Sequence, residues 1–323
     1  MNCGTTTIAA VIPSYNNAAF LPDTVRSIRT QTTPVNEIII VDDGSTDKTA
    51  EVVQTLGSDI RYIHQDNAGP SAARNRGAGA AETDFIAFLD ADDRWTNGRI
   101  ERQLGVMERY SQVALVAGDM QEIDNDNAVL APSVLARHNM LQFFEDLAGA
   151  PVPDAFALLM RINFIPTGTV LIRKAAFDDT GGFSKDIRYG EDLEVWAKIA
   201  SKHPIVCLPE VLMLRRQHGK NATRNTGPLL EDLVKVTKSA RSWGGPKLRE
   251  QGLDPDRLVA DALWQLGYWY FTQEQLAEAR RIFSESLREK FTRRSLLFAS
   301  ASMMPNFLVY KLRNFKQKLA GSD

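Results

Sequence analysis

The first 90 residues alternate between short apolar runs and segments with helical periodicity. Four runs have the length and composition of buried strands, at residues 8–12, 37–41, 60–64 and 85–89. The segments between them have the spacing of amphipathic or small-residue helices, at residues 20–31, 48–56 and 72–81. Strands that alternate with helices pair in parallel through right-handed crossovers. The pattern therefore predicts an α/β fold with a mostly parallel central sheet flanked by helices.

The alternation continues, less regularly, to about residue 227. It predicts a helix at 99–110, strands at 113–117 and 169–172, and an extended segment at 204–214. From residue 228 onward the strand patterns end and long amphipathic helices follow. We therefore place a domain boundary near Gly227 and Pro228. It separates an α/β domain at 1–227 from an α-helical C-terminal region at 228–323.

Polar residues follow three of the predicted strands directly. They are Pro13, Tyr15 and Asn16 after the first strand, Asp42 and Asp43 after the second, and Asp90, Asp92 and Asp93 after the fourth. Ligands of open α/β sheets bind outside the carboxyl ends of the strands, so we expect these loops to line one crevice. The alternative for the acidic cluster is a solvated turn before a helix.

Three carboxylates within four residues repel one another unless a cation lies between them. A hard divalent cation takes oxygen ligands and is commonly shared with substrate phosphates. We predict Asp92 as the direct metal ligand and Asp90 as a contact to a ribose or to a metal-bound water. Asp93 is interpreted as a helix cap.

The other strand-end residues are candidates for a nucleotide pocket. Asp42 or Asp43 could accept from a ring N–H or a ribose hydroxyl, and Tyr15 could stack on a base. Pro13 shapes the turn. Arg74, a cation in a helix of small residues, could contact a diphosphate. Taken singly, each has a plain alternative as a packed aromatic, a turn or a surface cation.

Glu191 and Asp192 stand at the start of a predicted helix, where the helix dipole favours an ionised carboxylate. An acidic pair there is a candidate general base for an acceptor hydroxyl, because that hydroxyl must lose its proton in a displacement. Simple helix capping is the alternative. Arg216 and His218 could reach departing phosphates, or could belong to a solvated loop.

Composition excludes several classes of protein. A net charge of −2 over 323 residues gives no electrostatic reason to expect a nucleic acid partner. The sequence contains neither G-x-G-x-x-G nor a Walker lysine motif, which argues against nicotinamide redox chemistry and P-loop hydrolysis. It has no signal-peptide pattern and no run of 18 apolar residues. We expect a cytoplasmic protein, either free or peripheral on the inner face of a membrane.

Six motifs, taken in order, resemble family 2 glycosyltransferases of GT-A fold. They are the stretches 11–16, 41–47, 67–75, 89–93, 190–192 and 216–223, the last resembling an Arg-x-His-x-x-Asn-x-Ser/Thr pattern. The resemblance covers residues 5–223. It implies inverting, metal-dependent transfer of a sugar from a nucleoside diphosphate, usually UDP, to a glycan or lipid-linked acceptor in polysaccharide or glycoconjugate biosynthesis.

Residue by residue, the resemblance implies that Asp42 recognises uracil and Asp90 the ribose. It implies that Asp92 of the Asp-x-Asp motif binds Mn²⁺ or Mg²⁺ and that Asp192 is the base, with Glu191 as the adjacent alternative. Arg74 and His218 would assist the nucleotide. The chain lacks the membrane spans and the Gln-x-x-Arg-Trp motif of processive members, which points to addition of one or a few sugars.

Two other functions compete with this interpretation. A catalytically inactive nucleotide-sugar or glycan binding module would share the fold, but the intact carboxylates speak against it. A nucleotidyltransferase usually has a glycine-rich basic loop near the first strand, and residues 13–17 offer none.

The end of the chain is basic. Residues 290–318 hold seven Lys or Arg and no acidic residue, interleaved with apolar side chains. A basic amphipathic helix of this kind lies on anionic membrane surfaces or packs its apolar side on a domain.

Overall fold

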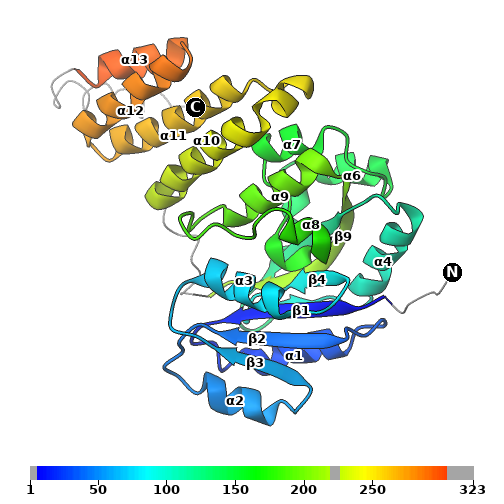
Figure 1. Cartoon of the computed structure of the whole chain (residues 1–323). Helices are drawn as coiled ribbons and strands as arrows, with labels where there is room; N and C mark the ends of the chain where they lie inside the picture. Colours follow the sequence, from blue (N-terminus) through cyan, green and yellow to red (C-terminus); the bar gives the residue numbers. More distant parts are fainter. Residues whose placement is uncertain (1–5, 219–225, 304–323) are drawn as a thin grey trace. The chain divides into compact units, whose positions relative to one another are not determined.

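The computed structural model describes residues 6–218 and 226–303 (Figure 1). The chain divides into two compact units: residues 1–186 with 191–221, and residues 187–190 with 222–323. The first unit contains the sheet and the second is helical. Part of the last motif, residues 219–223, and the basic stretch 304–318 lie outside the described residues.

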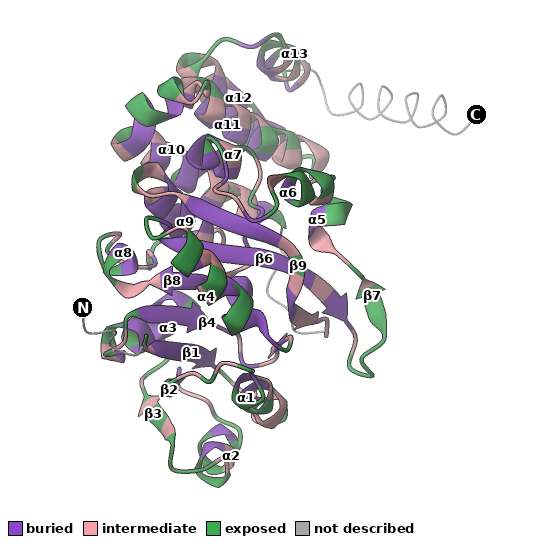
Figure 2. Ribbon diagram, turned by 90° about the vertical axis from the view of Figure 1, so that its right-hand side faces the viewer, coloured by how far each residue is buried: buried purple, intermediate pink, exposed green. Residues whose placement is uncertain are grey.

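The first four strands are β1 (Ile8–Ser14), β2 (Glu37–Asp42), β3 (Ile60–His64) and β4 (Phe85–Phe88). They pair in parallel in the order β3-β2-β1-β4. Between them the chain forms α1 (Leu21–Arg29), α2 (Thr49–Thr55) and α3 (Pro70–Ala80). Strands β1 and β4 are buried along their whole length (Figure 2). The predicted strand–helix alternation is confirmed here.

The second half of the sheet is mixed. Its strands are β5 (Arg94–Trp95), β6 (Leu115–Ile123), β7 (Val129–Ala131), β8 (Leu171–Arg173) and β9 (Ile205–Arg216). Strand β8 is antiparallel to both β4 and β6, whereas β6 and β9 are parallel. The apolar runs predicted β6, β8 and β9, but β5 and β7 were not predicted. Pairing direction depends on long-range connections and not on local pattern.

The helices of this half are α4 (Arg99–Arg109), α5 (Val134–Arg137), α6 (Leu141–Leu147), α7 (Ala155–Arg161), η1 (Thr167–Thr169), α8 (Lys174–Asp178) and α9 (Glu191–Lys202). The stretch 118–153 contains the end of β6, β7, α5 and α6. A turn lies at 124–127, where the Asp124 carboxylate accepts from the backbone N–H of Asp126 and Ala128 at 2.9 and 2.8 Å.

Pro13 lies within β1 and does not end it. In register, β4 pairs with β1 only as far as Val11, and the Leu89 N–H donates to the Val11 carbonyl just beyond that pairing. The backbone N–H position of residue 13 points to the same side as that of Val11, beyond the end of the pairing with β4. The missing N–H of Pro13 therefore costs no ladder hydrogen bond.

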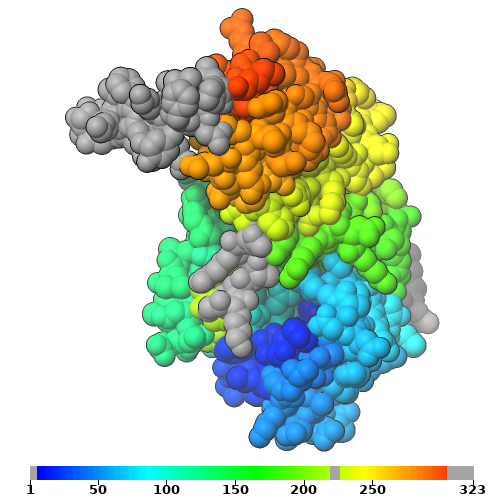
Figure 3. All heavy atoms as spheres, turned by 90° about the vertical axis from the view of Figure 1, so that its left-hand side faces the viewer, coloured from blue at the N-terminus to red at the C-terminus, as the bar shows by residue number. Residues whose placement is uncertain are grey.

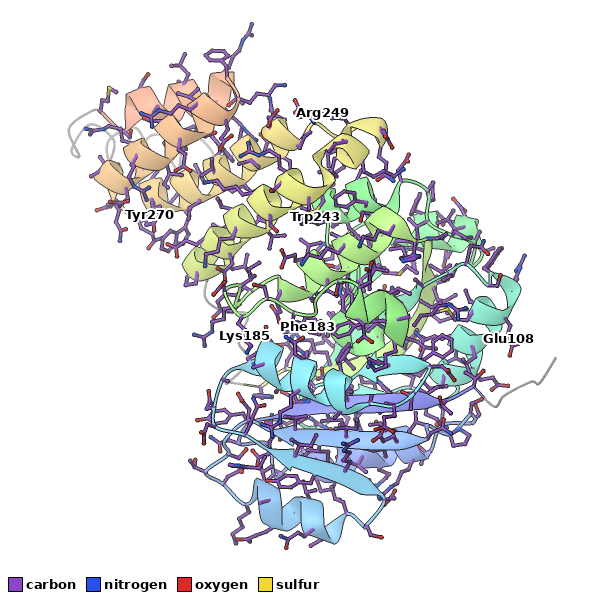
Figure 4. The ribbon with its side chains drawn as sticks, in the orientation of Figure 1. Glu108, Phe183, Lys185, Trp243, Arg249 and Tyr270 are labelled. Atoms are coloured by element: carbon purple, nitrogen blue, oxygen red, sulfur yellow. The ribbon has the colours of Figure 1, made fainter. Side chains whose placement is uncertain are left out.

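The helical unit consists of α10 (Thr226–Glu250), α11 (Pro255–Thr272), α12 (Leu276–Glu289) and α13 (Arg293–Ala301). Val259, Leu263 and Ile282 belong to its core between α10, α11 and α12. Tyr270, labelled in Figure 4, donates from its hydroxyl to Glu231 of α10 at 2.7 Å. None of the helices in the described parts of the chain has the length and apolar character that a bilayer crossing requires.

Candidate active site

Asn16 joins the loops after β1 and β2. Its φ of 55° lies in the left-handed region, which asparagine tolerates better than most residues. Its amide oxygen accepts from the N–H of Thr46 at 2.8 Å, and its own N–H donates to Ser45 Oγ at 2.9 Å. Asn16 therefore fixes the loop after β1 to the loop after β2. Next to it, the Tyr15 ring is 49% exposed and available for stacking.

Asp42 is held rigidly at the end of β2. Its carboxylate accepts from the N–H of Ser45 at 2.9 Å and from the Tyr62 hydroxyl at 2.6 Å. Burial and this hydrogen bond raise the pKa of Tyr62, so the phenol remains a donor. Tyr62 was not predicted, since nothing in the pattern of β3 distinguishes it from an ordinary strand residue.

Asp43 has a different set of partners. One oxygen accepts from Gln65 Nε2 at 2.6 Å and from the N–H of Ala68 at 2.9 Å, and the other accepts from the N–H of Gly69 at 2.8 Å. Asp43 thus anchors the loop that begins α3. Of the two carboxylates that the sequence left open, Asp42 has the fewer partners and is the better candidate for a base contact.

Arg74 is buried between two carboxylates and does not lie on the surface. Its guanidinium donates to Asp90 and to Glu191, both at 2.8 Å, and stacks over Phe183, which is labelled in Figure 4. Burial lowers the pKa of Arg74, but the charges of Asp90 and Glu191 outweigh it and raise the pKa overall. The residue joins the loop after β4 to the start of α9 and is not freely available to a diphosphate in this arrangement.

Asp93 does not cap a helix, and that interpretation is wrong. Helix α4 begins at Arg99, after Gly98. The carboxylate of Asp93 is buried and accepts from the backbone N–H of Arg216 at 2.9 Å. Burial and the charges of Asp92 and Asp90 raise the pKa of Asp93 well above its usual value. The residue ties the acidic loop to the end of β9.

Arg216 is also buried, and its side chain holds the acidic loop. It donates to the carbonyls of Asp92 and Asn125 at 3.4 and 3.3 Å, and its guanidinium lies over the Phe20 ring. A contact from Arg216 to departing phosphates therefore requires these partners to be exchanged. Phe20 was not predicted as a site residue.

Asp92 and His218 are in direct contact. Nε2 of His218 lies 2.8 Å from Oδ2 of Asp92, and the imidazole stacks on Phe20 at 5.4 Å between ring centroids. Burial and the charge of Asp90 raise the pKa of Asp92, while His218 opposes this shift. Bringing a buried carboxylate next to a second one is costly without a cation.

The donor set fits a divalent cation that completes its shell from a substrate. Asp92 offers a carboxylate oxygen, which suits Mn²⁺ or Mg²⁺, whereas the imidazole nitrogen of His218 is a ligand type that Mg²⁺ disfavours. Across residues 6–218 and 226–303, no group of three or more His, Cys, Asp or Glu side chains is placed to hold a metal ion. Diphosphate oxygens and water would have to supply the remaining ligands.

Asp192 lies in a pocket of donors at the start of α9. Its carboxylate accepts from the Thr167 hydroxyl at 3.0 Å, from Asn163 Nδ2 at 3.4 Å and from the N–H of Leu193 at 2.6 Å. Burial raises the pKa of Asp192, and the hydrogen bonds from Thr167 and Leu193 oppose this shift. The carboxyl group is thereby tuned upward toward the range in which a general base works well.

Glu191 is less suited to the same role, because its carboxylate is buried and accepts from the Arg74 guanidinium at 2.8 Å. Burial together with the charge of Asp192 raises the pKa of Glu191 to about 7, so its pKa alone does not decide against it. The geometry favours Asp192 as base and gives Glu191 the task of holding Arg74.

Thr167 owes its position to a buried arginine. Arg99 is fully buried and donates to the carbonyls of Gly168 and Val170 at 2.5 and 2.9 Å. Trp95 Nε1 also donates to the Gly168 carbonyl, at 3.1 Å. These contacts fix the η1 turn that presents Thr167 to Asp192. No local signal in the sequence marks Arg99, Thr167 or Asn163, because their partners are far away in the chain.

The fold and the site together define the class. A mixed, helix-flanked sheet with acidic strand-end loops at one edge is a GT-A-like fold. Residues 9–180 match the family model of Glycosyl transferase family 2, more than half of the chain, and the chain belongs to that family. Residues 191 and 192 lie beyond the matched range, so their assignment rests on the structure.

Relatives and solved structures agree with this family. An uncharacterized glycosyltransferase of Rickettsia felis is 32% identical over 235 residues, which are 72% of this chain and 36% of that protein. The putative teichuronic acid biosynthesis glycosyltransferase TuaG of Bacillus subtilis is 36% identical over 127 residues, 36% of this chain and 50% of TuaG. The chain spans about a third of the length of the first curated relatives it matches.

The fold is also that of S. aureus TarS. The structure of TarS 1-349 in complex with UDP-GlcNAc superposes with a TM-score of 0.70 at 17% identity, covering 97% of this chain and 92% of that one. The complex with UDP superposes with a TM-score of 0.67 at 16% identity and the same coverage.

Proposed function

We propose that this chain transfers a sugar, with inversion, from a UDP-sugar to a hydroxyl of a glycan or lipid-linked saccharide, in a metal-dependent step of polysaccharide or glycoconjugate assembly. The observation that carries the proposal is the Asp192 carboxylate, poised by Thr167 and Asn163 at the start of α9. The transferred group is a hexosyl or N-acetylhexosaminyl unit. The titles of the TarS structures, which name UDP and UDP-GlcNAc, support the choice of donor.

The proposed step is a single displacement. Asp192 accepts the proton of the acceptor hydroxyl while that oxygen forms a bond to the anomeric carbon of the sugar. The bond from the anomeric carbon to the phosphate oxygen breaks on the opposite face, and UDP departs with the electron pair. One base and no nucleophilic residue suffice, which is why the configuration inverts.

The remaining residues bind and orient the donor. Tyr15 stacks on the base, Asp42 accepts from it, and Asp90 contacts the ribose. Asp92 and His218 would hold Mn²⁺ or Mg²⁺, which when bound neutralises the diphosphate and stabilises the leaving group. Arg74 acts through the carboxylates it bridges. We assign it to the orientation of Asp90 and Glu191 and not to direct phosphate contact.

The test has two arms with Mn²⁺: a panel of nucleotide sugars, in which UDP release is measured, and UTP with a panel of sugar 1-phosphates, in which pyrophosphate release is measured. We expect slow UDP release with at least one UDP-sugar. Pyrophosphate release in the second arm would instead identify a nucleotidyltransferase. Tight binding without turnover on every acceptor tried would identify an inactive binding module.

Two substitutions separate binding from chemistry. Asp92→Asn should lose Mn²⁺-dependent UDP binding. Asp192→Asn should keep that binding and lower turnover by about 10²–10⁴, the usual contribution of a general base. Asp178→Asn is the matched control. Asp178 is an exposed carboxylate, and within the described residues Lys174 is the one cation with which it forms an ion pair. Full activity of Asp192→Asn would contradict the proposed base.

A further inference from the structure

Helix α13 packs Ala299 and Phe298 toward the core but leaves its two leucines outside. Ser295 and Ser302 are completely buried, whereas Leu296 and Leu297 are 47% and 65% exposed. Met303, two residues beyond the helix end, is 66% exposed. A surface helix ordinarily turns its large aliphatic side chains toward the core and not toward solvent.

The inner face is fixed by hydrogen bonds and not by apolar packing alone. Thr292 donates to Ser295 Oγ at 2.7 Å, and Ser295 Oγ lies 2.9 Å from Ser286 Oγ of α12. The Ser302 hydroxyl donates to the Ala299 carbonyl at 2.7 Å. Rotating α13 to bury its leucines would break the contact between Ser295 and Ser286 and the one that the Arg280 guanidinium donates to the Ser302 carbonyl. A buried polar group left unsatisfied costs about 1–3 kcal/mol. The leucines are therefore held outward.

The outward face continues on both sides of the leucines. Phe291, just before the helix, is 65% exposed. Arg293 precedes Leu296 and Leu297 by three and four residues, so it lies on the same face of the helix. We call Phe291, Leu296, Leu297 and Met303 the apolar face of α13. Figure 3 shows residues near 300, in orange-red, at the surface of the molecule.

Independently of the function proposed above, we propose that the apolar face of α13 docks on an anionic phospholipid surface. Apolar side chains beside exposed cations suit the boundary between headgroups and acyl chains. Between Lys290 and Met303 the chain has three Lys or Arg and no acidic residue. Lys290 and Arg294 are paired with Asp254 and Asp261, so Arg293 is the cation placed to meet lipid phosphates.

A second copy of the chain is a poorer partner for this face. A twofold contact between two α13 helices would bring Arg293 of each copy and the other cations of this segment into the same contact. Like charges that face each other across an interface repel and weaken it. The same cations would be attracted to an anionic surface. The sequence beyond Met303 adds four Lys or Arg and no acidic residue before Asp323, which strengthens the charge argument.

The test is flotation of the full chain with lipid vesicles. The wild-type chain should float with phosphatidylcholine vesicles containing about 30% phosphatidylglycerol and not with pure phosphatidylcholine. The double variant Leu296→Gln/Leu297→Gln should be recovered about tenfold less, because it removes buried apolar area from the contact. Arg293→Gln and high salt should each reduce flotation severalfold.

The matched control is Val129→Gln/Leu130→Gln. These two side chains in β7 are 53% and 56% exposed, so the control removes a similar apolar surface elsewhere. It should float like the wild type. Equal flotation of the α13 variant and the wild type, or absence of wild-type flotation, would overturn the proposal. A concentration-dependent dimer that the α13 variant abolishes would overturn it in favour of a second copy.

Discussion

At the scale of single residues, the candidate site is governed by charges that burial would otherwise penalise. Asp90, Asp92 and Asp93 lie close together, and Glu191 and Asp192 are adjacent. Arg74 offsets one carboxylate of each cluster, at 2.8 Å in both cases. A buried charge persists only with partners of this kind. Arg74 therefore links the loop after β4 to the start of α9 by two ion pairs.

Thr167→Val is expected to change the pH profile more than the maximum rate. The hydroxyl of Thr167 favours the ionised form of Asp192 and so lowers the pKa of that carboxyl group. Its loss raises the pKa, so a smaller fraction of the base is ionised on the acidic side. We expect kcat/KM to fall about fivefold to tenfold on the acidic limb of the profile, as for one lost hydrogen bond, and to reach the wild-type value on the plateau.

The control for this change is Thr167→Ser, which keeps the donor and should keep the wild-type profile. A uniform loss of activity at every pH in Thr167→Val, with no movement of the acidic limb, would mean that Thr167 has a merely structural role.

Glu191→Gln is expected to remove part of the pH dependence of stability. The pKa of Glu191 is raised from 4.5 to about 7 in the folded protein. Between those values the folded state binds more protons than the unfolded state, so the free energy of unfolding falls as the pH rises. The effect is on the order of 3 kcal/mol at most. Urea unfolding of the wild type and of Glu191→Gln at pH 5 and pH 8 measures this effect. If the free energy of unfolding changed equally between the two pH values in both proteins, the prediction would be refuted.

At the scale of elements, α3 shows why its sequence is made of small residues. A Cβ atom at Gly77 would lie 2.4 Å from Val11 Cγ1 and 3.1 Å from Val41 Cγ2. The helix thus packs directly on β1 and β2, which places Arg74 over the ends of the strands. The sequence predicted a helix of small residues here, but it gave no reason for the close approach of that helix to β1 and β2.

Gly77→Ala and Gly79→Ala form a matched pair within one helix. Both gain up to about 1 kcal/mol from helix propensity. At Gly77 the overpacking cost of about 1–3 kcal/mol outweighs that gain, whereas at Gly79 a Cβ meets nothing within 4 Å. Thermal unfolding should show the first variant destabilised and the second unchanged or stabilised. Similar melting temperatures for the two would contradict this packing.

At the scale of the whole molecule, the chain consists of two units with separate cores. The sheet unit holds every candidate site residue described above, and the helical unit holds the apolar face of α13. A ligand of the site should therefore stabilise the sheet unit first.

UDP and Mn²⁺ together are expected to stabilise the protein more than the sum of each alone. In the proposed site only Asp92 and His218, which lie 2.8 Å apart, would hold the metal from the protein side, so tight metal binding would need the diphosphate. A ligand at one hundred times its Kd adds about 3 kcal/mol to the free energy of unfolding, which raises Tm by several degrees. Scanning fluorimetry with and without a chelator measures this. A full shift with Mn²⁺ alone would indicate a preformed metal site instead.

The sequence by itself determined the N-terminal alternation of strands and helices, the strand-end carboxylates and the family. These follow from local signals, because burial of a strand and the edge at which its loop lies are encoded within a few residues. It also limited the candidates for the general base to two adjacent carboxylates. It named Asp92 as a candidate metal ligand and His218 as a candidate contact to the nucleotide.

Only the tertiary structure decided how these residues are used. Arg74 meets Glu191 across 117 positions of sequence, and Arg216 meets Asp93 across 123. Asp93 accepts from the backbone of Arg216 and does not cap a helix. Asp192 and Glu191 differ in their partners, because Asp192 accepts from Thr167 and Glu191 accepts from Arg74. The mixed pairing of β6, β8 and β9 and the outward leucines of α13 are of the same kind. Each depends on a partner distant in the chain, and a buried charge or hydroxyl takes its role from that partner.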